Sequence, residues 1–332
     1  MPTLYLLEPG SRLEKEYQRL LVTKDDEVLF RVPIQRVSQV VFIGRVGATT
    51  PALHALLQAE IPLLLVNRSG RLKGRLLPPT AANLPLRQEQ YRRNDDTAFC
   101  LALARAVVIG KVQNQRTLAL RLARRHDTID RAGLAVLKES MAQAEQADSL
   151  ARLLGIEGYA ARLYFRTYRQ AFSQAWQFQK RTRRPPKDPV NALLSLGYTF
   201  LTHSMMTALE AVGLDPYLGY FHAEKYGRPA LALDLVEEFR APVVDSLTLS
   251  LINRRWLQAD DFYMDTGSGG IYLKDRGFRI FLHNFSDKLE SKIKVRELDR
   301  SISYRKLFEV QARKIARFIQ GKEDVYRPFR AR

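Results

Sequence analysis

The spacing of hydrophobic and polar residues changes character once along the chain, near residue 80. Before that point, short β-prone segments such as TLYLLE, VSQVVFIG and IPLLLVN are separated by turn sequences such as NRSG. One helix interrupts them, TTPALHALLQAE, with Thr50 as the expected N-cap and Pro51 as its first residue. We therefore predict a β-rich N-terminal domain over residues 1–86.

From Arg87 onward the apolar residues recur with the period of an α-helix, beginning with the long segment RQEQYRRNDDTAFCLALARAVVIGKVQNQRTLALRLARR. A basic loop, QKRTRRPPK, leads into a helix with Asp188 as its N-cap, and DTGSGG predicts a small hairpin. YRKLFEVQARKIARFIQGK has the spacing of a basic amphipathic helix. The predicted fold class is α+β, with an all-helical C-terminal domain over residues 87–332.

The amino-acid composition predicts a binding partner. Fifty-three Lys and Arg against 35 Asp and Glu give 332 residues a formal net charge of +18, a field that attracts nucleic acid. Cys100 is the one cysteine and cannot form an intramolecular disulfide, which favours a reducing cytoplasm. The start lacks a signal-peptide pattern, and IPLLLV is too short to span a bilayer, so we expect a soluble protein with no membrane partner.

The segment LARLLGIEGYAARLYFRTYRQAF contains the first candidate for chemistry. On a helical projection Leu153, Leu154 and Tyr164 share one face, and four arginines share the opposite face. Glu157 falls in the middle of the apolar face, where an unpaired carboxylate is costly to bury. It is therefore either paired with a basic residue from elsewhere in the chain or a metal ligand on a rigid helix.

The second candidate is GLDPYLGYFHAEKYGRPALALDLVEEFR, residues 213–240. His222 is expected on or near a loop, before a helix that begins around Pro229. Asp234 and Glu237 are one turn apart on that helix. Glu157, His222 and Glu237 together make an oxygen and nitrogen donor set that suits Mg²⁺ or Mn²⁺, and such an ion on a basic protein suggests phosphodiester chemistry.

Other chemistries have no support in the sequence. It contains no P-loop, no G-x-S-x-G elbow, no H-E-x-x-H pair and no paired C-x-x-C. Two rival functions stay open. A tyrosine recombinase is also basic and helical, and it would use Tyr304 or Tyr326 as a nucleophile. A non-catalytic architectural protein would bind nucleic acid without needing any of the carboxylates.

At these same segments the chain resembles the family of CRISPR-associated protein one, the integrase and endonuclease that inserts new spacers into CRISPR arrays. The likeness covers essentially the whole chain. It includes TTPALHALL, GKVQNQR (110–116), GIEGYAARLYF (155–165), DPVNALLSLGYTFL (188–201) and the segment 213–240. The last three in this order are highly specific.

The resemblance implies that Glu157, His222 and Glu237 are metal ligands for Mg²⁺ or Mn²⁺ and that Asp234 supports the site. Some family members have Asp at the position of Glu237. Glu224 and Glu238 match no family ligand and are interpreted as surface or supporting groups.

The resemblance also implies partners and a reaction. Family members form homodimers through their β-domains, and two dimers flank a small CRISPR-associated adaptation partner, protein two, in a hetero-hexameric complex. The substrates are double-stranded DNA, namely a prespacer and the CRISPR repeat. A prespacer 3′-hydroxyl attacks a phosphodiester at the repeat boundary in a transesterification. From charge alone, we expect QKRTRRPPK and residues 291–332 to contact phosphates.

Overall fold

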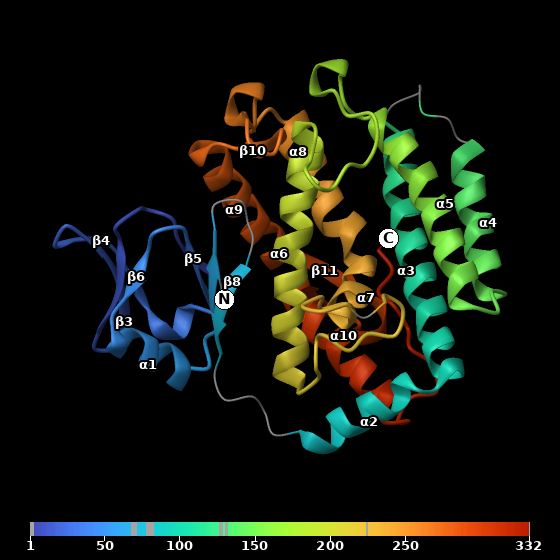
Figure 1. Ribbon diagram of the computed structural model, residues 1–332, viewed down its shortest axis with the longest axis horizontal. Coiled ribbons are helices and arrows are strands. Elements are labelled where there is room, and N and C mark those ends of the chain that lie inside the picture. The colour runs from blue at the N-terminus through green and yellow to red at the C-terminus, as the bar shows by residue number, and fades with distance from the viewer. Residues whose placement is uncertain are drawn as a thin grey trace. The chain divides into compact units, whose positions relative to one another are not determined.

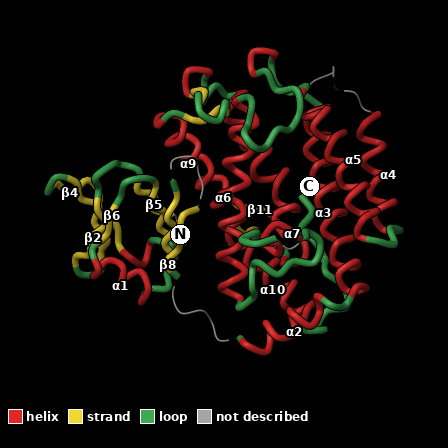
Figure 2. Tube along the Cα trace, viewed as in Figure 1, coloured by secondary structure: helices red, strands yellow, loops and turns green. Residues whose placement is uncertain are grey.

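The computed structural model describes residues 3–67, 72–77, 83–125, 129, 132–223 and 225–331. The chain forms two compact units, Met1–Ala81 and Ala82–Arg332. Strands dominate the first unit and helices dominate the second (Figure 2). The boundary predicted after residue 86 falls inside the first helix of the second unit. None of the described helices is both long enough and apolar enough to cross a membrane.

The first unit contains two four-stranded sheets. One has the order β1-β5-β7-β8, in which the first three strands are parallel and the last is antiparallel. The other has the order β4-β3-β2-β6 and is antiparallel except for the short β2–β6 pair. The strands are β1 Thr3–Leu6, β2 Arg12–Glu16, β3 Arg19–Lys24, β4 Glu27–Pro33, β5 Gln39–Ile43, β6 Gly47–Ala48, β7 Leu63–Val66 and β8 Leu72–Leu76.

Helix α1 (Thr50–Gln58) and the short 3₁₀ helix η1 (Ile34–Arg36) complete the first unit. The N-cap of α1 is Thr49, whose hydroxyl accepts from the Ala52 amide at 3.4 Å, so the prediction of Thr50 was one residue late. Leu13, Leu20 and Leu56 are fully buried between the sheets and the helix. Buried residues of the strands and of α1 therefore form one core.

The second unit is mostly helical. Its α-helices are α2 Leu84–Asn94, α3 Thr97–Ala123, α4 Ala132–Glu145, α5 Leu150–Arg169, α6 Pro189–Val212, α7 Ala230–Phe239, α8 Ser246–Asn253, α9 Asp275–Glu290 and α10 Tyr304–Ile319. Its shorter helices are η2 Gln174–Trp176, the π-helix η3 Arg240–Asp245, η4 Ala259–Asp261 and η5 Arg296–Leu298. Helices α3, α4 and α5 lie side by side, and α3 also packs against α7 and η3 (Figure 1).

One predicted helix start is confirmed here, and one long predicted helical segment is divided in two. Asp188 caps α6 by accepting from the Asn191 amide at 2.8 Å, as its position before Pro189 predicted. The long helical segment after Arg87 is divided into α2 and α3. The Asp96 side chain accepts from the Phe99 amide at 3.0 Å and so starts a new helix.

The prediction that this unit is all-helical was wrong. It contains two antiparallel hairpins, β9 Phe262–Asp265 with β10 Gly270–Leu273, and β11 Lys292–Val295 with β12 Arg300–Ser303. The glycine-rich turn had indicated the first hairpin. The second has an alternation too short, and too rich in lysine and arginine, to be distinguished from a loop by pattern alone.

Candidate active site

Glu157 lies on α5, whose apolar face is buried. Ser149 caps this helix by accepting from the Arg152 amide, and Leu153, Ala160 and Tyr164 are inaccessible to solvent. Leu154, expected on the same face, is 48 % exposed. The Glu157 side chain is 20 % exposed, and its Oε1 forms an ion pair with Lys111 of α3. The pairing with a distant basic residue, one of the two alternatives for this carboxylate, is therefore present.

Asp234 on α7 holds the loop that carries His222. Its two buried oxygens accept from the backbone amides of Tyr220, Phe221 and His222 at 2.8–3.1 Å. Its Oδ1 also lies 2.7 Å from His222 Nδ1. Because an ionised carboxylate can only accept, Nδ1 carries the proton of this hydrogen bond. Nε2 of a neutral ring is then an acceptor, and it lies 3.7 Å from Glu237 Oε1.

Lys111 is at the centre of the group. Only 6 % of this residue is exposed, and its ammonium pairs with Glu157 Oε1 and lies 2.6 Å from Glu237 Oε2. Glu237 Oε2 nevertheless accepts no well-aligned hydrogen bond from the described residues. The structure thus places Glu157 and Glu237 on one lysine ammonium, and it places His222 beside Glu237.

Lys111 was missed as a site residue from the sequence, although a signal was present. It follows AVVIG in a helix that is buried on most sides, and a lysine there needs an anionic partner. Arg240 was missed as well. Its guanidinium nitrogen lies 3.1 Å from Glu237 Oε1. Its charge follows directly after the last residue of α7, where the sequence pattern indicates only an ordinary helix end.

Arg240 connects the site to a buried tyrosine cluster. Its guanidinium lies 4.5 Å from the centre of the Tyr198 ring, a cation–π contact. Tyr198 donates to Asp245 Oδ1 at 2.5 Å, and Tyr164 donates to Oδ2 at 2.7 Å. Arg240 and Asp245 are the first and last residues of the π-helix η3, a local widening that is often found at functional sites.

The charges around Glu237 decide its protonation. Burial alone raises the pKa of this carboxyl group, but the positive charges of Arg240 and Lys111 outweigh burial and hold its pKa at about 2. Glu237 is therefore ionised at neutral pH. An ionised carboxylate is the form that accepts a cation.

Glu238, the neighbouring residue, has a different role from the surface or supporting role predicted for it. It is fully buried, and it accepts hydrogen bonds from the Tyr326 hydroxyl, the Phe329 amide and Gln311 Nε2. Burial raises the pKa of Glu238 to about 7 although these hydrogen bonds act in the opposite direction. It anchors the C-terminal segment rather than facing water. Glu224 lies outside the described residues.

The two tyrosines considered as nucleophiles are not exposed. Tyr304 is 6 % exposed and Tyr326 is 2 % exposed. Burial raises the pKa of Tyr304 to about 12 and raises that of Tyr326 well above its usual value. The Tyr326 hydroxyl donates to Glu238, so it belongs to the anchor of the C-terminal segment. Neither phenol is placed to attack a phosphodiester, which disfavours the tyrosine-recombinase alternative.

The basic loop before α6 is only partly free to contact phosphates. Arg181 bonds Asn191 Oδ1 at 2.8 Å and Ser195 Oγ at 3.0 Å, so it braces the start of α6, and the expectation of a phosphate contact does not hold for it. Lys180, Arg183 and Arg184 lie in the same loop, and all three are exposed. In the C-terminal segment, several basic side chains are in surface ion pairs: Lys306 and Arg313 with Glu309, Lys314 with Glu297, and Arg317 with Glu323.

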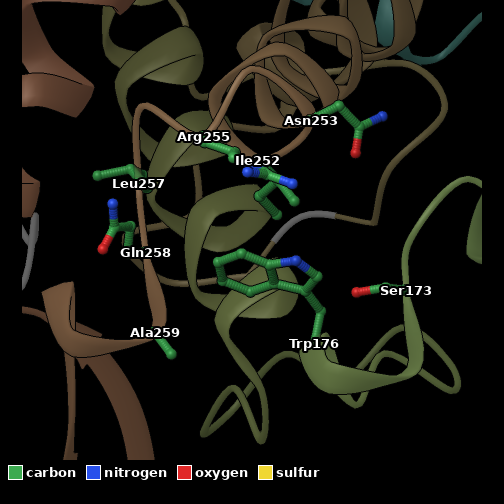
Figure 3. Close-up of a pocket in the computed structure, with 8 residues that line it drawn as sticks. All are labelled: Ser173, Trp176, Ile252, Asn253, Arg255, Leu257, Gln258 and Ala259. Atoms are coloured by element: carbon green, nitrogen blue, oxygen red, sulfur yellow. The ribbon is translucent and has the colours of Figure 1, made fainter.

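A separate cavity of about 500 Å³ lies in the second unit (Figure 3). Trp176, Ile252 and Leu257 give it an apolar part, and Asn253 and Arg255 contribute polar groups. None of the four predicted site residues lines it. The cavity is therefore not the place where Glu157, His222 and Glu237 meet.

The donor chemistry at that meeting place fits a hard divalent cation. Two carboxylates and an imidazole are typical ligands of Mg²⁺ or Mn²⁺, and the Asp234–His222 hydrogen bond is the usual support of a metal-binding histidine. No set of three or more His, Cys, Asp or Glu side chains is already gathered closely enough for a metal within the described ranges. Lys111 lies between Glu157 and Glu237 and pairs with both.

Comparison with known proteins gives a consistent result. The family model of the CRISPR associated protein Cas1 matches residues 4–287. "CRISPR-associated endonuclease Cas1 3" of Thermus thermophilus is 36% identical over 331 residues, 99% of this chain and 97% of the relative. A "CRISPR-associated exonuclease Cas4/endonuclease Cas1 fusion" of Geobacter sulfurreducens is 37% identical over 335 residues, 98% of this chain.

The chain spans only 60% of the length of that fusion protein. Among solved structures, a "Cas6-RT-Cas1--Cas2 complex" superposes with a TM-score of 0.83 and 27% identity. This match covers 99% of this chain and 36% of the other. The likeness therefore includes both units of the chain.

Proposed function

Because the chain belongs to the CRISPR-associated Cas1 family, we propose that it is a DNA endonuclease and integrase that inserts short DNA fragments into CRISPR arrays. The observation that supports the proposal is the set of contacts in which Lys111 pairs with Glu157 and Glu237 and His222 lies beside Glu237. The formal charge of +18 supports a polyanionic substrate. The substrates are the double-stranded DNA of a prespacer and of a CRISPR repeat.

Glu157, His222 and Glu237 are the residues that would hold Mg²⁺ or Mn²⁺. Such an ion, when bound, stabilises charge on a phosphoryl oxygen and lowers the pKa of an attacking hydroxyl. The chain's own contribution is orientation. Asp234 fixes the His222 ring so that Nε2 faces Glu237, and Arg240 fixes the Glu237 carboxylate from the other side.

Burial also keeps water away from the carboxylates of the site. Asp234 and Glu237 are both almost completely buried, so water does not compete for their oxygens. In a strand-transfer reaction the 3′-hydroxyl of the incoming DNA loses its proton and its oxygen bonds to the target phosphorus. The P–O3′ bond of the target breaks, and the leaving 3′-oxygen takes up a proton. With water as the nucleophile, the same arrangement acts as an endonuclease.

The proposed assembly is a homodimer that binds a small CRISPR-associated partner, Cas2, in a hetero-hexamer. The solved complex that resembles this chain contains Cas2, which supports the partner. The exposed side chains of Val28, Leu29 and Phe30 on edge strand β4 support dimerisation through the first unit. Sedimentation of Phe30→Glu tests this step, because a variant that stays dimeric contradicts the use of β4.

A strand-transfer assay tests the function. A duplex with free 3′-hydroxyl ends is incubated with a supercoiled plasmid that carries a CRISPR leader and repeat, together with Cas2 and Mn²⁺. Glu157→Gln and Glu237→Gln are expected to lower joining by at least about 100-fold, and EDTA to abolish it. The control Glu139→Gln, at an exposed position on α4, keeps full activity.

Two outcomes separate the alternatives in this assay. If joining survives EDTA but is lost in Tyr304→Phe or Tyr326→Phe, the protein is a tyrosine recombinase. If neither joining nor cleavage occurs with the wild-type chain and DNA binding is unchanged by Glu157→Gln and Glu237→Gln, an architectural role replaces the catalytic one.

A further inference from the structure

Lys111 has the two carboxylates of the site as its partners. It comes from α3, whereas Glu157 comes from α5 and Glu237 from α7, so three separate helices meet at one ammonium group. The lysine side chain is 7 % exposed, which leaves little water to replace either contact. No sequence pattern assigned a function to this residue.

The charges at this point balance without any metal ion. Glu157 and Glu237 contribute two negative charges, and Lys111 and Arg240 contribute two positive charges within ion-pair distance. Removing the ammonium would leave two carboxylates side by side with one guanidinium. The two carboxylates would then repel each other, and Glu157 would lose its ion-pair partner.

A divalent ion would need the oxygens that Lys111 contacts. Mg²⁺ binds carboxylate oxygens at about 2.0–2.1 Å and withdraws from them the negative charge that holds the ammonium. The ammonium and the metal ion also repel each other as like charges. Binding of one therefore weakens binding of the other.

From these contacts we infer that Lys111 is an internal counter-ion that competes with the divalent cation for Glu157 and Glu237. It is a positioning residue, which keeps the metal-free site assembled and lowers the site's affinity for metal. This inference rests on the metal site of the proposed function and adds to it the residue that controls loading. The α3 segment GKVQNQR thereby acquires a role at the site.

The test measures metal binding directly, on the full-length chain freed of metal. Lys111→Met keeps the length of the side chain and removes its charge. Titration with Mn²⁺, followed by the electron paramagnetic resonance signal of the free ion, is expected to show at least tenfold tighter binding than in the wild type. The melting temperature of the metal-free variant is expected to fall and to recover on addition of Mn²⁺.

Three further variants guard the interpretation. Lys111→Gln replaces Lys111→Met if the latter does not fold, with the same expectation. Lys111→Met combined with Glu157→Gln removes one charge of each sign, so its metal-free melting temperature returns toward the wild-type value while Mn²⁺ binding is lost. Lys288→Met, at a half-buried lysine in the same unit, changes Mn²⁺ affinity by less than twofold.

The outcomes are distinguishable. Equal or weaker Mn²⁺ binding in Lys111→Met and Lys111→Gln overturns the competition and makes the lysine a support for the ligands. Absence of Mn²⁺ binding in the wild type and in every folded variant overturns the metal site itself, and the inference falls with it. Tighter binding in both uncharged variants supports the inference.

Discussion

Asp234 shows how a single carboxylate can organise this site without being free to bind an ion. Both of its oxygens are occupied by backbone amides and by His222 Nδ1, and the residue is completely buried. These bonds define the path of the loop over residues 220–222 and the orientation of the imidazole. The position of His222 is therefore set by a residue on the next helix and not by its own neighbours in the chain.

Asp234→Asn tests this role. The amide presents one acceptor where the carboxylate presents two, so some of the three backbone amides and Nδ1 are left without a partner. We expect Mn²⁺ affinity to fall about 10–100-fold, the usual effect of removing the hydrogen-bond partner of a histidine ligand. Calorimetric titration measures it. Asp188→Asn, also at a buried aspartate, is the control, and equal Mn²⁺ affinity in the wild type and Asp234→Asn would contradict the assignment.

Asp245 makes the stability of the protein depend on pH. Burial raises its pKa from 3.8 to about 6, although hydrogen bonds from Tyr164 and Tyr198 act in the opposite direction. Between these two pH values the unfolded chain has released the proton and the folded chain keeps it. The folded state then binds more protons, so its stability falls as the pH rises. The groups facing Asp245 are Tyr164, Tyr168, Tyr198, Arg181 and Arg240.

Asp245→Asn is expected to remove this dependence of the protein's stability on pH. The free energy of unfolding of the wild type, minus that of the variant, should decrease by up to about 3 kcal/mol between pH 4 and pH 7, because a pKa difference of one between the folded and unfolded states corresponds to about 1.4 kcal/mol. Denaturant titrations at half-unit pH intervals measure the difference. Asp260→Asn, at an exposed site, serves as the control. A difference that does not change with pH would show that Asp245 ionises as in the unfolded chain.

At the scale of elements, the contact between α6 and η3 holds the π-helix close to the site. Gly197 of α6 makes this contact possible, because a Cβ atom there would lie 2.5 Å from Val244 Cγ1. Tyr198, the next residue, then reaches both Arg240 and Asp245. One small residue thus allows the close approach that connects α6 to Glu237 through Arg240.

Gly197→Ala is expected to destabilise the protein by about 1–3 kcal/mol, the usual cost of overpacking a buried contact. Gly155→Ala is its matched control in α5, where a new Cβ meets no atom within 4 Å. There the better helix propensity of alanine should stabilise by up to about 1 kcal/mol. Thermal and denaturant unfolding of both variants measure the contrast. Equal effects would mean that α6 and η3 adjust freely.

At the scale of the whole molecule, the net charge predicts binding to DNA that weakens with salt. Replacing Lys180, Arg183 and Arg184 together by Gln should flatten the plot of log affinity against log salt concentration. The slope should change by about one for each DNA phosphate that the variant no longer neutralises. Fluorescence anisotropy with a labelled duplex measures the slope.

Arg181→Gln is the control within the same loop. Arg181 braces the start of α6, so its replacement should lower the melting temperature and leave the salt slope unchanged. If the triple variant keeps the wild-type slope, this loop does not contact phosphates. The basic residues of the C-terminal segment that pair with Glu297, Glu309 and Glu323 should then be examined in the same way.

Much of the architecture was predictable from local pattern. The change of period near residue 80 separates strands from helices, because the two structures place apolar side chains at different intervals. The helix cap at Asp188 and the hairpin at the glycine-rich turn depend only on residues adjacent in the sequence, and both predictions are confirmed. The hairpin β11–β12 was not predictable, because its four-residue strands are stabilised by pairing with each other and not by an apolar face.

By itself, the sequence determined which side chains are unusual in their surroundings: Glu157 on an apolar helix face, His222 in a loop, Asp234 and Glu237 one turn apart on α7. Only the tertiary structure decided that Lys111 and Arg240 complete the group. Both lie far from Glu157 along the chain, and their charges matter only at ion-pair distance. A pattern in the chain records which groups need a partner, whereas the packing of α3, α5 and α7 decides which partner each group receives, because burial leaves no water as a substitute.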